Sequence, residues 1–352
     1  MTTPTAPTGH PAAPDPVVEI YERRLAARLG VEHVVAVSSG TAALHCALAA
    51  LGVGPGTEVL VPALTVIMSA APVAHLGARP VFVDCLPDGD LDPHDATAKT
   101  TPRTAAIMQV QLWGRTGNQT LARALADRHG LPLVVDSCQA LGSTVDSHQA
   151  GLHGDVACFS THDLKLLRTG EGGFLTTDNP TIAAHARAYR SHGHTPDGPA
   201  GLGHNYRLAA ALAHLGLAEL DHLDDTLAHR VALTTLAHQL LAEVPGLEPV
   251  PADPGCNHYA PLARITLPRP RAFAEHLATR GVPNSTGTFG LVPLDHRPQL
   301  ADTEATGARC ATAAEVLEGI LALVLTHRDD EASVRRHVDT IAREVARWTS
   351  RH

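Results

Sequence analysis

The chain has 352 residues, of which 44% are hydrophobic and 18% are charged, and this composition is typical of a globular protein with more than one domain. The formal net charge of −9 at pH 7 gives no electrostatic attraction to nucleic acids or anionic membranes, so neither is expected as a partner. A small polar metabolite is therefore a better candidate for the ligand than a nucleic acid or a membrane.

Residues 1–16 are predicted to form a disordered tail. They are rich in Thr, Pro and Ala and lack the basic and apolar regions of a secretory signal peptide.

The six cysteines include no Cys-x-x-Cys pair, so we expect reduced thiols in a cytoplasmic protein. Histidines such as His192 and His194 have no carboxylate or cysteine partner at a diagnostic spacing, so no metal site is expected. Apolar stretches such as Gly319 to Leu325 are far shorter than the roughly 20 residues that a membrane helix needs.

Strands and helices are predicted to alternate after this tail. A helix is expected over residues 17–29, where apolar residues recur at helical spacing. The strands predicted next are 34–37, 58–62, 80–84, 105–110 and 133–136, and the helices between them include 41–51, 69–76 and 121–129. This alternation predicts a parallel α/β sheet, whose ligands bind beyond the carboxyl ends of the strands. The residues that follow Val37, Pro62, Val110 and Val135 are therefore the first candidates for a site.

The chain is predicted to divide into two domains near residue 244. An Ala- and Leu-rich helical pattern covers about 208–243 and leads into a Pro-rich stretch, 245–254, which is a plausible hinge. We therefore expect a large domain over residues 17–244 and a small C-terminal domain over residues 245–352.

A turn of small residues, Ser38 to Leu44, links a predicted buried strand to a helix. Backbone N–H groups at such a helix N-terminus bind anions, so Gly40, Thr41 and Ala42 are candidates to hold a phosphate. For this motif alone, an ordinary Ser/Thr helix cap is the better interpretation.

Asp136 and Lys165 are the candidates for chemistry. Asp136 ends the strand 133–136, where its carboxylate either pairs with a protonated ring nitrogen or, equally often, caps the next helix. Lys165 lies between an apolar strand-like segment, 156–160, and the Gly-rich turn 169–173, whereas most single lysines are solvated surface charges. Burial there is expected to lower the pKa of the amine and to make it a nucleophile toward aldehydes.

The order in which these motifs occur along the chain is more specific than any single motif. A phosphate turn, an Asp with Gln139 three residues on, Ser160 with Lys165 five residues on, and Gly-Glu-Gly-Gly at 170–173 follow one another along the chain. In this the sequence resembles the DegT/DnrJ/EryC1/StrS family of aminotransferases that depend on pyridoxal 5'-phosphate (PLP), clearly over residues 17–225 and loosely beyond. The resemblance implies an α/β fold of the aspartate-aminotransferase type (fold type I), with a mainly parallel central sheet flanked by helices and a smaller C-terminal α+β domain.

The same resemblance implies a reaction. PLP would be the cofactor, and an amino group would move from an amino acid, glutamate or glutamine, onto a keto-cyclitol or keto sugar in secondary metabolite biosynthesis, such as that of antibiotics. Retention of Lys165 favours this amino transfer, and the sequence Lys165-Leu166-Leu167 resembles the cyclitol branch slightly more than the nucleotide-sugar branch.

Roles for individual residues also follow from the resemblance. Lys165 would form a Schiff base with PLP and shuttle the proton, Asp136 would keep the pyridine nitrogen protonated, and Gln139 would lie near the cofactor hydroxyl. Asn205 would reach the phosphate of the neighbouring subunit, which makes a homodimer with shared active sites, unless it only caps the helix that follows. The remaining phosphate ligands would be Gly40, Thr41, Ala42 and Ser160.

The chain departs from the family pattern in three places. Val66 stands where the family usually has an aromatic that stacks on the pyridine ring, so this cofactor contact is in doubt. The segment before the first helix is short, so another segment or subunit must complete that wall of the pocket. Aromatic residues make up only 3% of the chain, which leaves few platforms for a nucleotide base. These departures keep open a dehydratase, a cyclase or a lyase on the same fold, and a non-catalytic partner protein.

Overall fold

The computed structural model describes residues 15–195, 198–199, 201–300 and 309–351. The predicted tail lies outside these residues, except for its last two. Helix α1 (Pro16–Leu29) begins inside the predicted tail, since the side chain of Asp15 caps it by accepting a hydrogen bond from the N–H of Val17. Pro16 at the first helical position has no N–H to satisfy, so it suits this start.

A seven-stranded sheet forms the centre of the molecule. In spatial order its strands are β1 (His33–Val37), β9 (Gly173–Thr177), β8 (Val156–Ser160), β5 (Leu133–Asp136), β4 (Thr104–Val110), β2 (Glu58–Pro62) and β3 (Arg79–Val83). Among them only β9 runs opposite to the others, because it pairs antiparallel with both β1 and β8. The predicted mainly parallel sheet is therefore confirmed. β9 is absent from the predicted strands because its Gly-Gly start is typical of a turn.

Helices cover both faces of this sheet, and alternate strand residues face two separate cores. Val35, Val37 and their counterparts pack with α2 (Gly40–Ala50), α3 (Ile67–His75) and α6 (Pro180–Tyr189). Val34 and Ala36 pack on the other side with helices that include α1, α4 (Pro93–Lys99), α5 (Gln119–His129) and α7 (Ala210–Asp221). Burial on both faces is typical of a parallel sheet and holds all the strand ends rigidly at one edge.

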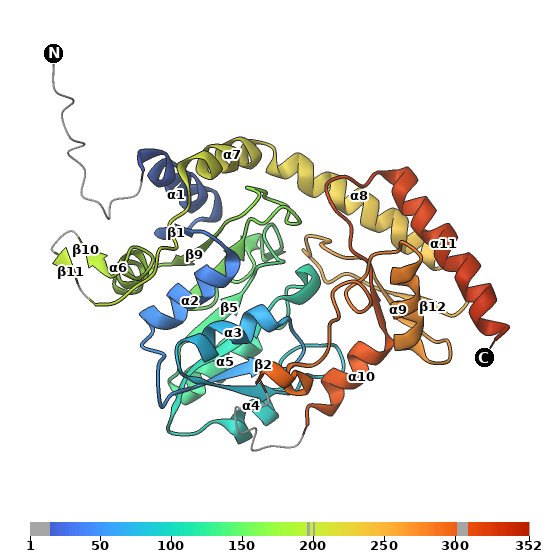
Figure 1. Cartoon of the computed structure of the whole chain (residues 1–352), viewed down its shortest axis with the longest axis horizontal. Helices are drawn as coiled ribbons and strands as arrows, with labels where there is room; N and C mark the ends of the chain where they lie inside the picture. Colours follow the sequence, from blue (N-terminus) through green and yellow to red (C-terminus); the bar gives the residue numbers. More distant parts are fainter. Residues whose placement is uncertain (1–14, 196–197, 200, 301–308, 352) are drawn as a thin grey trace, which may run out of the picture.

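A smaller antiparallel sheet lies in the C-terminal part of the chain, to the right in Figure 1. Its strands are β12 (Leu247–Val250), β13 (Leu262–Ile265) and β14 (Ile320–Ala322), and its helices are α9 (Pro270–Thr279), α10 (Ala311–Gly319) and α11 (Glu331–Thr349). Helix α8 (Leu223–Leu241) runs along the top of the molecule from α7 and packs on α11 (Figure 1). The predicted helical run 208–243 is thus two helices, separated at His222.

The Pro-rich stretch 245–254, interpreted above as a hinge, contains the strand β12. Its Pro249 is tolerated because β12 is an edge strand, which pairs on one side only. The predicted domain boundary at residue 244 falls between α8 and β12, and the division into two domains stays a prediction.

The remaining elements are short. They are the hairpins β6 (Thr144–Val145) with β7 (His148–Gln149) and β10 (His194–Thr195) with β11 (Gly198–Pro199), and the 3-10 turns η1 (Leu112–Gly114), η2 (Leu294–His296) and η3 (Pro298–Leu300). Within the described ranges, no helix has the length and apolar character needed to cross a membrane.

Candidate active site

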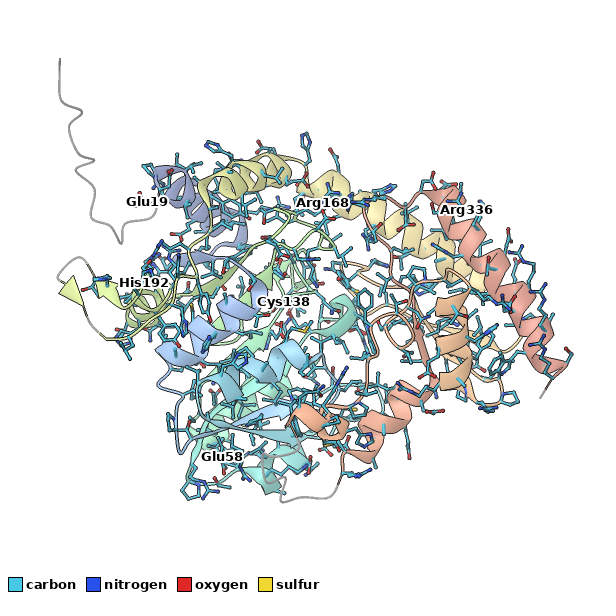
Figure 2. All side chains as sticks on the ribbon, in the orientation of Figure 1. Glu19, Glu58, Cys138, Arg168, His192 and Arg336 are labelled. Atoms are coloured by element: carbon cyan, nitrogen blue, oxygen red, sulfur yellow. The ribbon has the colours of Figure 1, made fainter. Side chains whose placement is uncertain are left out.

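A cavity of about 390 Å³ opens at the carboxyl ends of the parallel strands, where the predicted topology places a ligand. One side of it is built from the ends of β1, β4, β5 and β8, and the other from C-terminal residues 259–324. Figure 2 places Cys138, which lines the cavity, near the centre of the molecule. The volume lies in the range of small-molecule and cofactor sites.

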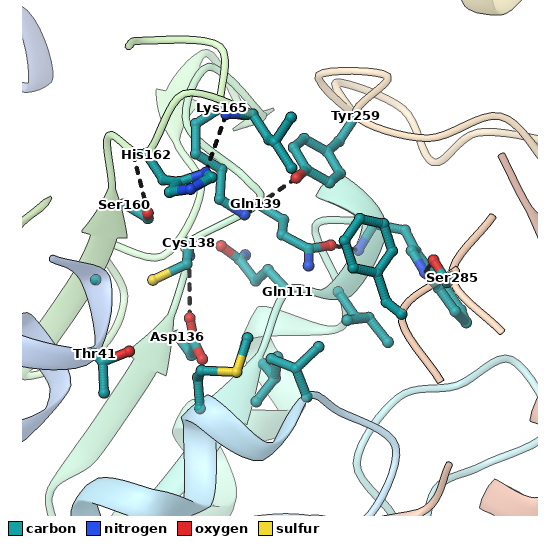
Figure 3. A pocket seen from close by; sticks show the side chains of 18 of the residues that line it. Thr41, Gln111, Asp136, Cys138, Gln139, Ser160, His162, Lys165, Tyr259 and Ser285 are labelled. Carbon is teal, nitrogen blue, oxygen red and sulfur yellow. Dashed lines mark hydrogen bonds between the residues drawn. The ribbon is translucent and has the colours of Figure 1, made fainter. Parts of the chain in front are cut away.

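Most of the predicted site residues meet in this cavity. Its lining includes Gly40, Thr41, Val66, Asp136, Gln139, Ser160 and Lys165. All of these except Gly40 and Val66 are labelled in Figure 3. Ala42 and Asn205 do not line it. Side chains that lie far apart in the sequence are therefore brought together as the ordered set of motifs predicts.

Asp136 is buried at the end of β5, with 4% of its surface exposed. Its Oδ2 accepts a 2.7 Å hydrogen bond from Ser69 Oγ, and its Oδ1 accepts a 3.1 Å bond from the N–H of Cys138. Ser69 is held in turn by Thr65 at 2.8 Å. No helix follows Asp136, since residues 137–143 form turns, so the helix-cap interpretation is wrong. A carboxylate has about four acceptor positions, so this one can still accept a bond from a protonated ring nitrogen.

Lys165 lies in the loop between β8 and β9. This loop is closed by backbone bonds from Thr161 N to Gly172 O and from Asp163 N to Gly170 O, both 2.9 Å long. The lysine Nζ donates a 3.1 Å hydrogen bond to the hydroxyl of Tyr259, drawn dashed in Figure 3. The Gly-rich turn that follows Lys165 therefore fixes the loop that presents it to the cavity.

The expected depressed pKa of Lys165 is wrong for the cofactor-free site. Burial lowers the pKa of the amine, but Tyr259, Cys138 and Asp136 favour the charged form and together outweigh burial, so the net pKa is raised. The prediction considered burial alone, because from the sequence no residue near the amine is known. Cofactor-free Lys165 is therefore an ammonium at neutral pH.

The turn before α2 combines the two interpretations given above. Ser39 is indeed a helix cap, since its Oγ accepts a 3.0 Å bond from the N–H of Ala42. This bond satisfies the Ala42 N–H, so that group is not available for a phosphate. The N–H groups of Gly40 and Thr41 have no acceptor within the helix, and both residues line the cavity. The helix N-terminus is therefore positioned to bind an anion there.

Gly40 marks a close approach of α2 to the sheet. A Cβ atom at this position would lie 2.7 Å from Cys138 Sγ and 2.8 Å from the Cβ of Ser160. Ser160, whose Oγ accepts a 3.3 Å bond from the N–H of His162, also lines the cavity beside this helix end. Only glycine lets the phosphate turn sit so near the strand ends.

Gln139 and Val66 form further parts of the lining. Gln139 Oε1 accepts a 2.7 Å bond from the N–H of Trp113, which fixes the amide in the cavity. Val66 is followed by Ile67 and by Met68, whose side chain is 49% exposed. This wall is therefore aliphatic with a thioether, and a stacking aromatic is absent from the predicted position.

Asn205 is exposed and lies in an extended segment beside the end of β1. It forms a bridge with Ser191, and the carbonyl of the next residue, Tyr206, accepts a 2.8 Å bond from the N–H of Ser38. The following helix α7 starts at Ala210 with Ala209 as its cap residue, so the cap interpretation of Asn205 is wrong. Asn205 contributes nothing to the cavity of its own chain.

The residues that the sequence did not point to come mainly from the C-terminal part. Tyr259, Ser285 and Arg297 line the cavity but carry no local motif. Trp113 had a signal, because it follows the strand end at Val110 that the topology selects. Its backbone has φ 59°, and the next residue must be a glycine, since a Cβ at Gly114 would lie 2.0 Å from Asn257 Oδ1.

The residues present fit PLP. A helix N-terminus with a glycine at its closest approach suits the phosphate, a buried and oriented carboxylate suits a protonated pyridine nitrogen, and one amine suits the aldehyde. The helix N-terminus, the carboxylate and the amine all line the same cavity, and together they match the three reactive groups of PLP.

Comparisons with known proteins agree with this chemistry. Residues 8–342 match the model of the DegT/DnrJ/EryC1/StrS aminotransferase family. GDP-perosamine synthase of Caulobacter vibrioides is 41% identical over 229 residues, which cover 64% of this chain and only 62% of that relative's length. The dTDP-3-amino-3,4,6-trideoxy-alpha-D-glucose transaminase of Streptomyces venezuelae is 32% identical over 96% of this chain and 88% of that relative. The solved structure of DesI with its TDP-sugar product is 30% identical, with a TM-score of 0.84, and covers 96% of this chain and 87% of that chain.

Proposed function

Because the chain belongs to the DegT/DnrJ/EryC1/StrS aminotransferase family, we propose that it is a PLP-dependent aminotransferase that moves an amino group from an amino acid onto the ketone of a sugar. Membership confirms the resemblance stated for the sequence. The observation that carries the proposal is the meeting of Lys165, Asp136 and the N-terminus of α2 in one cavity.

PLP, when bound, supplies an aldehyde that bonds to amines and a ring that stabilises negative charge on the neighbouring carbon. Gly40, Thr41 and Ser160 would hold its phosphate, and Asp136 would hold the ring nitrogen protonated. Asp136 is prepared for this task because Ser69 and the N–H of Cys138 already fix its orientation. Lys165 would bind the aldehyde through Nζ.

Lys165 has a second task in this proposal. When it is not bonded to the cofactor, the Lys165 amine would accept a proton from the α-carbon of the amino acid at Nζ and would later donate that proton from the same atom. The Gly-rich loop keeps Nζ within the cavity for both transfers.

The acceptor proposed is a keto sugar carried on a nucleotide, with a keto-cyclitol as the alternative. Although aromatic residues are few, the fold gathers Trp113, Tyr259 and Phe289 around the cavity, and Phe289 is 54% exposed. Arg297 also lines it, and its buried Nε has no hydrogen-bond partner among the described residues. Its Nη2 donates a 2.7 Å bond to the carbonyl of Gly290, which holds the group at the cavity. A stacking surface and a guanidinium group suit a base and a diphosphate, and the two relatives named above by their enzyme activity are described by nucleotide sugars.

Glutamate or glutamine is the proposed amino donor, and secondary metabolism is the proposed setting. The shared-site homodimer is proposed as well. It is supported by the position of Asn205, which is exposed and lies outside its own cavity on a segment bonded to Ser38. The cytoplasmic location inferred from the cysteine pattern stays a prediction.

The proposal is tested by the colour of the purified protein. We expect a visible absorption band that borohydride bleaches while it fixes the cofactor to Lys165. The sequence contains only two lysines, Lys99 and Lys165, so a peptide map gives an unambiguous answer. Lys165→Ala should remove the band and at least about 10³-fold of the activity, while Lys99→Arg should keep both. A pyridoxyl group on Lys99 would overturn the assignment.

The substrates are tested by product analysis. Nucleotide-linked keto sugars and keto-cyclitols, each offered with glutamate and with glutamine, should give an aminated product only with the true pair, as detected by mass spectrometry. If only a keto-cyclitol is aminated, the acceptor is a keto-cyclitol and not a nucleotide-linked keto sugar.

A further inference from the structure

Among the described residues, Tyr259 is the side chain to which the Lys165 amine donates a hydrogen bond. The Tyr259 hydroxyl accepts the 3.1 Å hydrogen bond from Nζ, which also lies 4.9 Å from the centre of the phenol ring. The two residues are 94 positions apart and belong to opposite sides of the cavity (Figure 3). Neither the strand ends nor the motifs around Lys165 account for this contact.

The backbone of Tyr259 is held by a buried network. Its N–H donates to Asn257 Oδ1 at 3.0 Å, and its carbonyl accepts a 3.0 Å bond from Nη1 of Arg230. Arg230 is only 4% exposed, and its Nη1 also donates to the carbonyl of Leu325. Both sides of the Tyr259 peptide are therefore fixed before any ligand binds.

The same network joins Tyr259 to the cofactor side of the cavity. Asn257 Nδ2 donates to the carbonyls of Gln139 at 2.8 Å and Leu141 at 2.9 Å. A Cβ on Gly114 would lie 2.8 Å from the Cβ of Tyr259, so the chain keeps that position free of a side chain. The backbone of Tyr259 is thus tied to the cofactor side of the cavity through Asn257.

We propose that Tyr259 is the partner of the Lys165 amine whenever that amine is not bonded to the cofactor, and that it holds the proton which Lys165 carries between the two transfers. This role rests on the proposed function. The phenol oxygen stabilises an ammonium because it accepts a hydrogen bond from it, and the ring face adds to this attraction.

Tyr259 neither gains nor loses a proton over the two transfers. In the first transfer the C–H bond of the amino donor breaks, its electron pair stays with the conjugated system, and the proton forms a new N–H bond at Nζ. In the second transfer that N–H bond would break, its electron pair would return to Nζ, and the proton would form a C–H bond with the electron pair left on the ligand by the first transfer. Between them the ammonium donates to the Tyr259 oxygen, so the proton is kept from water.

Other titratable groups also face this amine. Cys138 and Asp136 favour its charged form together with Tyr259, and His162, Glu171 and Arg297 line the same cavity. The raised pKa of Lys165 agrees with the proposal, since burial alone lowers it. An experiment must therefore remove the phenol hydroxyl and leave the other groups in place.

The test uses the cofactor-free protein labelled with ¹³C at the lysine ε-carbons. Its two lysines give two signals, which Lys99→Arg assigns, and Lys99 serves as internal reference because it pairs with Asp95 at 2.7 Å outside the cavity. We expect Tyr259→Phe to lower the pKa of Lys165 by about one unit, a tenfold change in its acid dissociation constant, and to leave Lys99 unchanged. Tyr189→Phe, which removes a hydroxyl bonded to His45, is the matched control and should move neither.

A second measurement tests the same contact without a Tyr259 variant, so it also applies if Tyr259→Phe does not fold. The chain has four tyrosines, so ¹³Cζ labelling resolves them, and Lys165→Ala should shift the Tyr259 signal alone. An unchanged Lys165 pKa in folded Tyr259→Phe, or an unmoved Tyr259 signal in Lys165→Ala, would overturn the contact.

Activity then separates this inference from the proposed function. In Tyr259→Phe the rate of the donor half-reaction should fall about tenfold, with KM unchanged and the pH profile displaced in the same direction as the Lys165 pKa. An even loss at every pH without a displaced profile would make Tyr259 a structural residue and reject the inference. A wild-type protein that transfers no amino group would reject the proposed function, whereas the two NMR results would still report on the contact itself.

Discussion

The two sides of the cavity differ in how they are built. The cofactor wall, made of Gly40, Thr41, Asp136, Gln139 and Ser160, consists of residues at or just after strand ends of one sheet. The C-terminal wall, made of Tyr259, Ser285, Phe289 and Arg297, comes from irregular segments of the other part of the chain. The first wall is positioned by the sheet itself. The second is positioned by hydrogen bonds within its own part of the chain, such as that from Arg230 to the Tyr259 carbonyl, and by contacts across the cavity.

Those contacts are few and specific. Trp113 Nε1 donates a 3.1 Å bond to Ser285 Oγ, and Asn257 bonds the carbonyl of Gln139. From this comparison we expect cofactor retention to depend on the first wall and substrate binding on the second. Variants in the two walls should therefore fail in different ways.

The largest expected effect is that of Asp136→Asn in the cofactor wall. The variant should fold and bind PLP but lose about 10²- to 10³-fold in kcat, because a neutral amide does not hold the positive charge of the ring nitrogen. Steady-state kinetics and the absorption spectrum measure both properties. A near wild-type rate would show that Asp136 serves only to orient the turn at Cys138.

Gly40→Ala tests how tightly the cofactor wall is packed. The added methyl would lie 2.7 Å from Cys138 Sγ, against the end of β8, so we expect a loss of about 1–3 kcal/mol in unfolding free energy and weaker PLP binding. Gly319→Ala is the control, since a Cβ there would meet nothing within 4 Å and should change the stability by less than about 0.5 kcal/mol. Urea unfolding of both variants measures the difference, and equal stabilities would contradict the close approach.

Arg297→Gln tests the C-terminal wall. If this guanidinium binds the anionic group of the acceptor, KM for the keto sugar should rise about tenfold, while PLP affinity and the KM of the amino donor stay unchanged. The three constants are measured on the same preparations. A loss of PLP affinity would break the separation between the walls, and an unchanged KM would remove Arg297 from acceptor binding.

Asn205→Ala has the smallest expected effect, because it removes one neutral hydrogen bond to a phosphate. PLP affinity should fall by about two- to tenfold, although Asn205 does not line the cavity of its own chain. Fluorescence titration with PLP measures the change. An unchanged affinity would remove Asn205 from cofactor binding.

The assembly is tested by mixing this variant with Lys165→Ala. A mixed dimer has both lesions in one site and none in the other, so subunit exchange of equal amounts should restore wild-type PLP affinity in about a quarter of all sites, as measured by titration with PLP. An active monomer in light scattering, or subunit exchange with no recovery, would contradict the shared site.

The sequence by itself predicted a mainly parallel main sheet and most of the residues that meet in the cofactor wall. Alternating strands and helices predict parallel strands with their carboxyl ends at one edge, and the residue types that follow Val37 and Val135 then indicate a phosphate site and a charged partner for a ring. This prediction works because strand ends are positioned by local pattern and by one sheet.

Only the tertiary structure decided the rest of the site. It placed Tyr259 against Lys165, raised the pKa of that amine where burial alone predicts a lower one, and left Asn205 outside its own cavity. It also showed that β12 occupies the stretch interpreted as a hinge, and that β9 pairs with β1 and β8. Each of these depends on contacts between residues far apart in the chain, and neither periodicity nor motif spacing carries information about such contacts.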